Sequence, residues 1–503
     1  MRAWGKRARP ANEARDAYKI GSVLAWVLAS NTVLAGPVQD GLSGASCQPH
    51  PDARQQDAAV STEAPRPQHT WSAEEIRASR TVDATASALP PTFETATVAR
   101  SLIVEDDGHR LAVFDGERIE PIAVRPPGFG VHGSPQFSPD GRFAYWATRD
   151  GWVTQFDLWH MKTVAATRVG HETHGIAVSS DGRHVLAANV LPRTLVALDA
   201  NGLALEKTIP VAGLKGTASR IAALHDAGRR NSFIVVLQDV PEIWEIPYDG
   251  RPVYKGLVHD YRLKEGIPET GPLPVRRIEL EDSLDDVFLD PNHDYLVGRP
   301  HRQAAAQLIH LGVGRKIGEV ALPEGSRLDG AVGWARQHED GTSQRVVAAA
   351  NLGQASITLL DLKGGKLLAT LPTPGASRRL YSHDATPYLW VDVCEGPLAG
   401  TLRVIDKQTL ERVADLAPVP GAEIVHVGFD RHGKRALVAL RGPQDELVVY
   451  DARTLTEIRR LPVQRPTGSY TLPSRTQMPG DEAPSGTRVP RPTTNSSDVL
   501  VAE

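Results

Sequence analysis

Cysteine is nearly absent from this sequence, which limits the kinds of site that it can build. Its 503 residues include two cysteines, Cys47 and Cys394. Two cysteines cannot supply a framework of several disulfides, a four-cysteine zinc site or an iron–sulfur cluster held by cysteine alone. Cys47 precedes Gln48-Pro49-His50, but attachment of a c-type heme through C-x-x-C-H needs a second cysteine there. The sequence therefore predicts no covalent c-type heme.

A positive charge excess and a long hydrophobic run are missing too. Fifty-six Lys and Arg stand against 60 Asp and Glu, a formal net charge of -4, which argues against nucleic acid as a partner. The apolar run Ile20–Ala29 is too short for a comfortable membrane span. It follows several basic residues and precedes small residues at Val33-Leu34-Ala35, as in an export signal. We expect residues 1–35 to be a signal peptide and no stable membrane span after cleavage; an uncleaved anchor or a wrong start codon is the alternative.

The two ends of the remaining chain lack the apolar period of a packed domain. Residues 36–95 are rich in Ala, Pro, Ser, Gln and Asp and are interpreted as a mostly disordered linker, with one short helix at Trp71–Ser79. Residues 471–503 are rich in Pro, Thr and Ser and are predicted to be a disordered tail.

Between residues 96 and 470 the chain repeats a unit of four short apolar strands. The third strand of each unit closes with an aspartate or a histidine, and turns such as Ser138–Arg142 (SPDGR) and Ser179–Arg183 (SSDGR) precede several of these strands. The closing residues are Asp115, Asp157, Asp199, Asp249, His310, Asp361, Asp406 and Asp451, so the spacing is 42 residues at first and 61 at most. Four strands per unit at this period are typical of a propeller blade.

Eight closing segments therefore predict an all-β fold, an eight-bladed β-propeller over residues 96–470. A sandwich would not show the period, and a parallel α/β sheet would need helical patterns between the strands. Residues 256–290 fall in the longest spacing and are interpreted as an insertion that either covers a site or decorates the rim.

Several histidines and arginines stand where blades begin. They are His132 (FGVHGSP), His171 and His174 (VGHETHG), Arg327 (EGSRLDG) and His383 (LYSHDATP), with Arg149 in the turn TRDG. Imidazole binds heme iron and other metals, and a guanidinium pairs with carboxylates, but a hydrogen-bonded loop histidine, a chance pair at His171/His174 and a turn-completing Arg149 explain the same pattern.

Motifs of other enzyme classes are missing. There is no G-x-S-x-G, no Walker loop and no dinucleotide-binding G-x-G-x-x-G in a βαβ setting. Asp285-Asp286 are either paired carboxylates for acid–base chemistry or a solvated acidic rim, and the rim is the preferred interpretation.

The run VHGSPQFSPDGRFAYWATRDGWVTQFDLWHM resembles the start of the heme d1 domain of cytochrome cd1 nitrite reductases and their relatives. The segments HGIAVSSDGRHVLAAN, SHDATPYLWVDV and VVYDARTLTEIRRLPVQRPTGSY extend the resemblance from Leu102 to about Tyr470. The run HDYRLKEGI…PVRRIELEDSLDD is most like the NirN-type branch. That branch acts late in heme d1 biosynthesis, where it dehydrogenates a propionate of dihydro-heme d1 to the acrylate.

The resemblance implies roles for single residues. His132 matches the proximal ligand of the d1 iron, and Arg149 matches an arginine near the propionates. His174 falls where nitrite reductases have an arginine, and His383 matches a histidine expected on the distal side, with a catalytic role. Arg327 and Asn351 replace histidines of the relatives, so Arg327 is expected to hold a carboxylate.

The leading hypothesis is a periplasmic protein that binds heme d1 or dihydro-heme d1 in d1 biosynthesis, insertion or redox chemistry, as an enzyme or as a carrier. Since relatives carry a c-type heme domain ahead of the propeller, the expected partners are a separate periplasmic electron carrier or a cytochrome cd1 nitrite reductase. The alternative is a cofactor-free propeller that serves as an interaction module. Direct nitrite reduction ranks last, and the sequence sets no oligomeric state.

Overall fold

The computed structural model describes residues 71–83, 100–105, 108–116, 118–126, 130–255, 266–301, 303 and 305–471. The predicted signal peptide, most of the predicted linker and residues 472–503 lie outside the described residues. Within the described ranges, no helix is long and apolar enough to cross a membrane.

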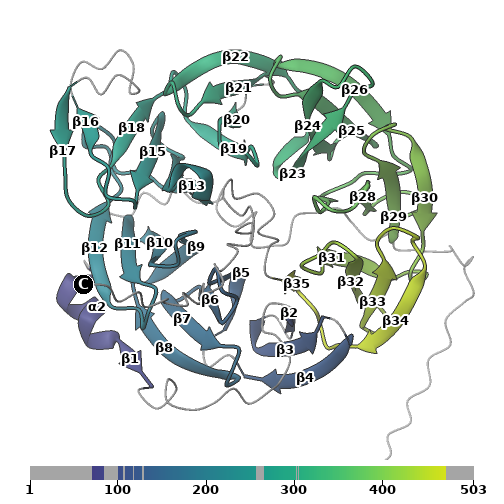
Figure 1. Ribbon diagram of the computed structural model, residues 1–503, viewed down its shortest axis with the longest axis horizontal. Helices are drawn as coiled ribbons and strands as arrows, with labels where there is room; N and C mark the ends of the chain where they lie inside the picture. Colours follow the sequence, from purple (N-terminus) through teal and green to yellow (C-terminus); the bar gives the residue numbers. More distant parts are fainter. Residues whose placement is uncertain are drawn as a thin grey trace, which may run out of the picture. The chain divides into compact units, whose positions relative to one another are not determined.

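The described strands form a ring of eight four-stranded antiparallel blades, which confirms the predicted propeller (Figure 1). Neighbouring strands along the chain pair within each blade. The first four blades, each written from the channel outward, are β35 (Gly468–Thr471), β2 (Arg100–Glu105), β3 (Arg110–Asp115) and β4 (Glu120–Arg125); β5 (His132–Phe137), β6 (Phe143–Ala147), β7 (Trp152–Asp157) and β8 (Lys162–Arg168); β9 (Glu172–Val178), β10 (His184–Leu191), β11 (Thr194–Asp199) and β12 (Leu205–Pro210); β13 (Ile221–Ala227), β14 (Ser232–Leu237), β15 (Glu242–Pro247) and β18 (Arg276–Glu279).

The other four blades follow the same order. They are β19 (Leu284–Leu289), β20 (Tyr295–Pro300), β21 (Ala305–His310) and β22 (Arg315–Ala321); β23 (Ser326–Gln337), β24 (Ser343–Asn351), β25 (Ser356–Asp361) and β26 (Lys366–Pro372); β27 (Leu380–Tyr381), β28 (Tyr388–Val393), β29 (Thr401–Asp406) and β30 (Arg412–Leu416); β31 (Glu423–Phe429), β32 (Arg435–Arg441), β33 (Glu446–Asp451) and β34 (Glu457–Pro462).

The turn motif of blade 2 binds the closing aspartate of that blade. In blade 2, Ser138 Oγ donates to Asp140 Oδ1 (2.5 Å) and accepts from the N–H of Phe143 (2.9 Å), while Arg142 pairs with the fully buried Asp157 (2.9 Å). Burial alone would raise the pKa of Asp157, but the hydrogen bonds from Arg142 and His160 lower it. The S-x-D-G-R turn and the closing aspartate are thus two ends of one interaction.

The hydrophobic core lies between blades rather than inside them. The buried apolar residues form eight clusters, and each cluster joins two neighbouring blades. A blade cannot bury both of its faces alone, so closing the ring supplies the missing contact. The ring closes where β35, the last described strand, pairs with β2, with Tyr470 opposite Leu102. Strands from the two ends of the repeat region therefore share blade 1.

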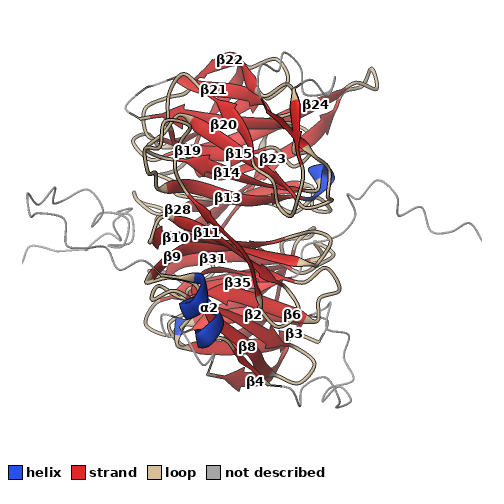
Figure 2. Cartoon of the chain, turned by 90° about the vertical axis from the view of Figure 1, so that its left-hand side faces the viewer, coloured by secondary structure: helices blue, strands red, loops and turns tan. Residues whose placement is uncertain are grey.

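Part of the predicted linker packs on the propeller. Helix α2 (Ala73–Ser79) begins with a capping box formed by Ser72 and Glu75, and its Ile76 is 1% exposed against blades 2 and 3. Strand β1 (Thr81–Val82) then adds a fifth strand to the outer edge of β8. Figure 2 shows α2 at the outside of the ring. The predicted helix is confirmed, but residues 71–83 are not disordered.

The long spacing in blade 4 is mostly regular structure. The hairpin of β16 (Val253–Lys255) and β17 (Ile267–Glu269) is inserted beside blade 4, and residues 256–265 lie outside the described residues. The rest of the predicted insertion is β18 and the innermost strand β19. Asp286 of β19 is therefore not on a solvated rim. It pairs with Arg299 (2.9 Å) and accepts the N–H of Leu328 (2.8 Å).

Candidate functional site

The innermost strands of all blades begin at the same end of the central channel, which we call the entry end. His132 is the first residue of β5, His174 the third of β9 and Arg327 the second of β23. Arg149 lies in the turn between β6 and β7, and its carbonyl accepts the N–H of Thr173 (3.4 Å), next to His174. The structure thus places four of the five predicted site residues at one end of the channel.

His132 and Arg149 are held by the same pair of strands. His132 is half-buried and pairs with Ala147, two residues before Arg149. The turn that follows is rigid: Thr148 Oγ1 donates to Asp150 (2.5 Å) and accepts from the N–H of Trp152 (2.9 Å). Gly151 has φ +90°, and a Cβ there would lie 2.1 Å from the carbonyl oxygen of Gly170 in blade 3. The backbone that carries the exposed side chain of Arg149 is therefore held in one position.

Three aromatic side chains from blades 7, 8 and 1 complete this end of the channel, and sequence reasoning missed them. His426, the fourth residue of β31, has its ring 5.5 Å from that of Tyr381 and 5.2 Å from that of Tyr470. Tyr470 in turn hydrogen-bonds Ser134, two residues after His132. The group therefore runs without a break from blade 7 to the predicted ligand in blade 2.

His426 is held neutral. Its Nδ1 accepts the backbone N–H of Ser469 (3.4 Å), so the ring proton is on Nε2. Burial, together with the positive charge of Arg379, lowers its pKa to about 3. At neutral pH His426 therefore offers an N–H donor, in the channel, with no net charge.

The two tyrosines are held protonated. Burial raises the pKa of Tyr381, with a smaller contribution from Asp392, and burial raises that of Tyr470 as well. The Tyr381 hydroxyl is buried and has no hydrogen-bond partner among the described residues. An unsatisfied buried hydroxyl costs about 1–3 kcal/mol, and a ligand acceptor would remove that cost.

Arg327 and Arg379 place positive charge on the same end of the channel. Arg327 pairs with Asp329 through two nitrogens. Burial would raise the pKa of Asp329, but Arg327 and, at longer range, Arg379 lower it. Arg149, Arg327 and Arg379 thus place guanidinium groups at this end of the channel, where they can pair with the carboxylate groups of a ligand.

The side chain of Asn351 forms hydrogen bonds inside its own blade, blade 6. It is fully buried, accepts from Ser326 Oγ (2.6 Å) and donates to Ser356 Oγ and Thr358 Oγ1 (both 2.9 Å). Its amide hydrogen bonds are used within blade 6. The same arrangement occurs around Asn189 in blade 3, which binds Thr173 and Thr194.

Two predicted histidines lie elsewhere. His383 is in the β27–β28 turn, beyond the end of its innermost strand, at the end of the channel opposite to His132. Its Nδ1 accepts the N–H of Ala385 (3.1 Å), and its ring packs against Gly433. His171 packs edge-on against Trp71 at 5.0 Å, beside α2. Among the described residues, no three His, Cys, Asp or Glu are arranged to hold a metal ion.

The channel widens into a cavity below the entry end. About 420 Å³ is enclosed by residues of blades 2 to 6, among them Gln136, His225, Asp226 and His293. Burial lowers the pKa of His225, and it raises that of Asp226 to about 6 against the hydrogen bonds from Ser180 and Tyr248. The cavity is thus lined by a neutral histidine, His225, and by a carboxylate, Asp226, that takes up a proton only near pH 6.

Residues 99–262 and 265–474 match the family described as the cytochrome D1 heme domain. The chain belongs to this family. The resemblance inferred from the sequence is therefore confirmed, and the eight-bladed ring is a cytochrome d1 heme domain.

Relatives with known names lie within the same family. Dihydro-heme d1 dehydrogenase of Pseudomonas aeruginosa is 39% identical over 413 residues, 82% of this chain and 79% of that protein. A solved structure of dihydro-heme d1 dehydrogenase NirN in complex with DHE has a TM-score of 0.72, at 39% identity, and covers 81% of this chain and 83% of that chain. Protein NirF of the same organism is 27% identical over 383 residues, 73% of this chain and 90% of that protein.

Proposed function

We propose that the protein binds dihydro-heme d1 at the entry end and dehydrogenates its propionate to the acrylate of heme d1, late in heme d1 biosynthesis, after export to the periplasm. One observation carries the proposal: blades 6, 2 and 3 place a polar side chain within the first three residues of their innermost strands, and the ring contacts of His426 join blades 7, 8 and 1 to this group. These side chains are Arg327, Tyr381, His426, Tyr470, His132 and His174. A continuous girdle of this kind suits a flat, carboxylate-bearing ligand, and the relative at 39% identity is named for this reaction.

The residues present fit the tetrapyrrole. His132 would ligate the iron, and Arg149, Arg327 and Arg379 would pair with carboxylates. The unpartnered hydroxyl of Tyr381 would gain an acceptor. When bound, dihydro-heme d1 supplies the propionate that loses two hydrogens.

The protonation states of the other channel residues indicate which of them would donate a hydrogen bond to the ligand and which would accept a proton from it. His426, Tyr381 and Tyr470 are held as donors and would orient the ligand. His174 stays neutral because burial lowers its pKa, although Glu172 opposes this, so it would accept a proton from the reacting side chain. Two electrons and the other proton would pass to a separate acceptor protein, since the sequence contains no C-x-x-C-H. A cytochrome cd1 nitrite reductase would receive the product.

The test is a visible spectrum of the purified protein with dihydro-heme d1, before and after adding an electron acceptor. We expect a stoichiometric bound band that His132→Ala removes and His383→Ala leaves in place, because His383 lies at the other end of the channel. With acceptor, the band should convert to that of heme d1.

Two results would contradict the proposal. The absence of any band would favour the cofactor-free interaction module. A band that never converts with acceptor present would favour a carrier.

A further inference from the structure

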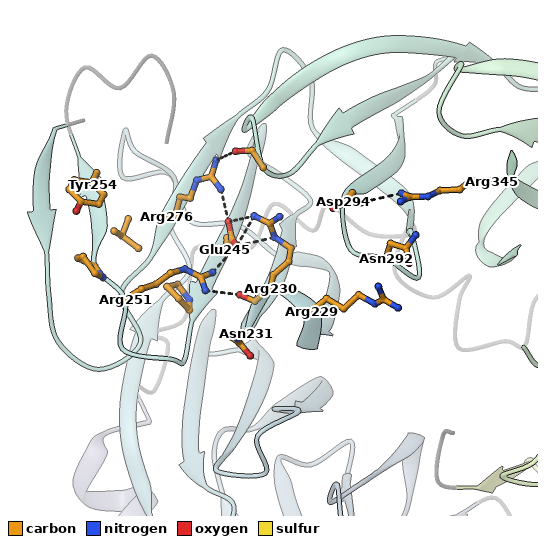
Figure 3. A pocket seen from close by; sticks show the side chains of 14 residues that line it. Arg229, Arg230, Asn231, Glu245, Arg251, Tyr254, Arg276, Asn292, Asp294 and Arg345 are labelled. Carbon is orange, nitrogen blue, oxygen red and sulfur yellow. Dashed lines mark hydrogen bonds and ion pairs between the residues drawn. The ribbon is translucent and has the colours of Figure 1, made fainter. Parts of the chain in front are cut away.

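A second cavity, of about 710 Å³, lies at the end of the blades opposite to the entry end. Residues of blades 4, 5 and 6 and of strand β16 line it, and its side chains converge from the β13–β14 and β19–β20 turns and from β15, β18 and β24 (Figure 3). Arginine dominates the lining. The arginines are Arg229, Arg230, Arg251, Arg276 and Arg345.

One buried carboxylate holds three of these arginines in place. Glu245, whose side chain is 2% exposed, pairs with Arg230 (2.9 Å), Arg251 (3.1 Å) and Arg276 (2.6 Å). Ser232 Oγ donates to the same carboxylate (3.2 Å). Glu245 is therefore saturated with donors and fixes the direction of the guanidinium groups around it.

The charges in this cluster do not balance. Arg251 also pairs with Asp249 (2.7 Å), so two carboxylates face three arginines. Arg229 adds a fourth positive charge, since its guanidinium pairs with no carboxylate in the described parts of the chain and its backbone N–H is donated to His293 (3.3 Å). Arg345, on the far wall, pairs with two carboxylates, Asp290 and Asp294, so these three residues together carry one excess negative charge. The near wall keeps an excess of two positive charges, which a bound anion would offset.

The positive charges of this cluster affect the pKa of a neighbouring histidine, His293. Burial, together with the positive charges of Arg229 and Arg230, lowers the pKa of His293 to about 4. His293 is therefore neutral and leaves the positive charge to the arginines. Tyr254, Val253 and Pro252 supply an apolar wall on the opposite side of Glu245.

We propose that this cavity binds a small, multiply charged oxyanion, with phosphate or carboxylate groups held by Arg229, Arg230 and Arg251. The ligand would sit on donors that Glu245 has already oriented. The site is separate from the entry end and needs no tetrapyrrole.

Calorimetric titration of the full-length protein with pyrophosphate and, separately, with citrate tests this proposal, in low-salt buffer and without tetrapyrrole. We expect saturable binding with one site per chain. Arg229→Gln should weaken it about tenfold, since a hydrogen bond to a charged group contributes this much or more. Arg453→Gln removes an exposed arginine from the turn between β33 and β34 in blade 8 and should leave the affinity within about twofold.

Preference for pyrophosphate or for citrate would support the site and name the ligand chemistry. Absence of saturable binding to both anions would overturn the proposal, as would an equal loss in the two variants. Since no tetrapyrrole is present, failure here would leave the proposed dehydrogenase function untouched.

Discussion

Acidification should destabilise the folded protein through the neutral channel histidines, and His426 offers the sharpest test. Its pKa in the folded protein is about 3, because of burial and Arg379. In an unfolded chain a histidine titrates at about 6.5. The unfolded state therefore binds more protons as the pH falls below 6.5, and the free energy of unfolding falls with it.

The size of the effect follows from these two values. Between pH 7 and pH 5.5, His426 should lower the free energy of unfolding by about 1 kcal/mol. His293, with a folded pKa of about 4 from burial and the nearby arginines, should contribute about the same. Asp226 acts in the opposite sense, because burial raises its pKa to about 6; it should add somewhat less than about 1 kcal/mol over this range.

Urea unfolding followed by tryptophan fluorescence at pH 7.0 and pH 5.5 separates these contributions. In His426→Gln the loss of stability on acidification should be smaller than in the wild type by about 1 kcal/mol, whatever the stability of the variant at pH 7. His293→Gln should show a similar reduction. If His426→Gln loses as much stability as the wild type between the two pH values, the neutral buried state of His426 is refuted.

Three further predictions address the blade, the chemistry and the helix. Asn351→Ala should lower the free energy of unfolding by about 2–4 kcal/mol in urea, because Ser326, Ser356 and Thr358 lose their partner, while the tetrapyrrole band persists; loss of the band at unchanged stability would contradict this. His174→Gln should lower the dehydrogenation rate about 10²–10⁴-fold, and the wild-type rate should decline only below about pH 6.5 because the pKa of His174 is lowered; an unchanged rate would remove the proton-accepting role. Ile76→Ala should speed hydrogen exchange across α2 and β1 but not in the inner strands; equal protection in both proteins would show that Ile76 does not anchor the helix.

The sequence predicted the blades well because each blade is a local unit. In blade 2, for example, Asp157 and Arg142 lie only 15 residues apart and one ion pair joins them. The extent of the blade 4 insertion was less clear. β18 and β19 carry charged residues such as Arg276, Arg277 and Asp286, and each of these pairs with an opposite charge inside its own blade.

Blade-start loops alone did not predict the site. His383 stands out in S-H-x-x-x-P-Y, but β27 is two residues long, so the histidine falls beyond its end. His426 lies inside a strand, E-I-V-H-V-G-F, where it reads as one polar residue among apolar ones. Comparing blades would have helped with Asn351: Ala188-Asn189 and Ala350-Asn351 occupy the same place in blades 3 and 6, which indicates a structural asparagine.

The position of a residue within its innermost strand decides whether it reaches the site. Ser134, His174 and Tyr470 are each the third residue of their strands, although they come from three different blades. His426 is the fourth of β31, but the pairing with β32 skips Val425, so that Ile424 and His426 oppose consecutive residues, Leu440 and Ala439. Similar irregularities fall at His174 in β9 and between His132 and Gln136 in β5, so the pairing of the innermost strands is irregular near each of these side chains. A one-residue bulge leaves no clear signal in the sequence, and for that reason the central histidine of the site becomes visible only in the folded ring.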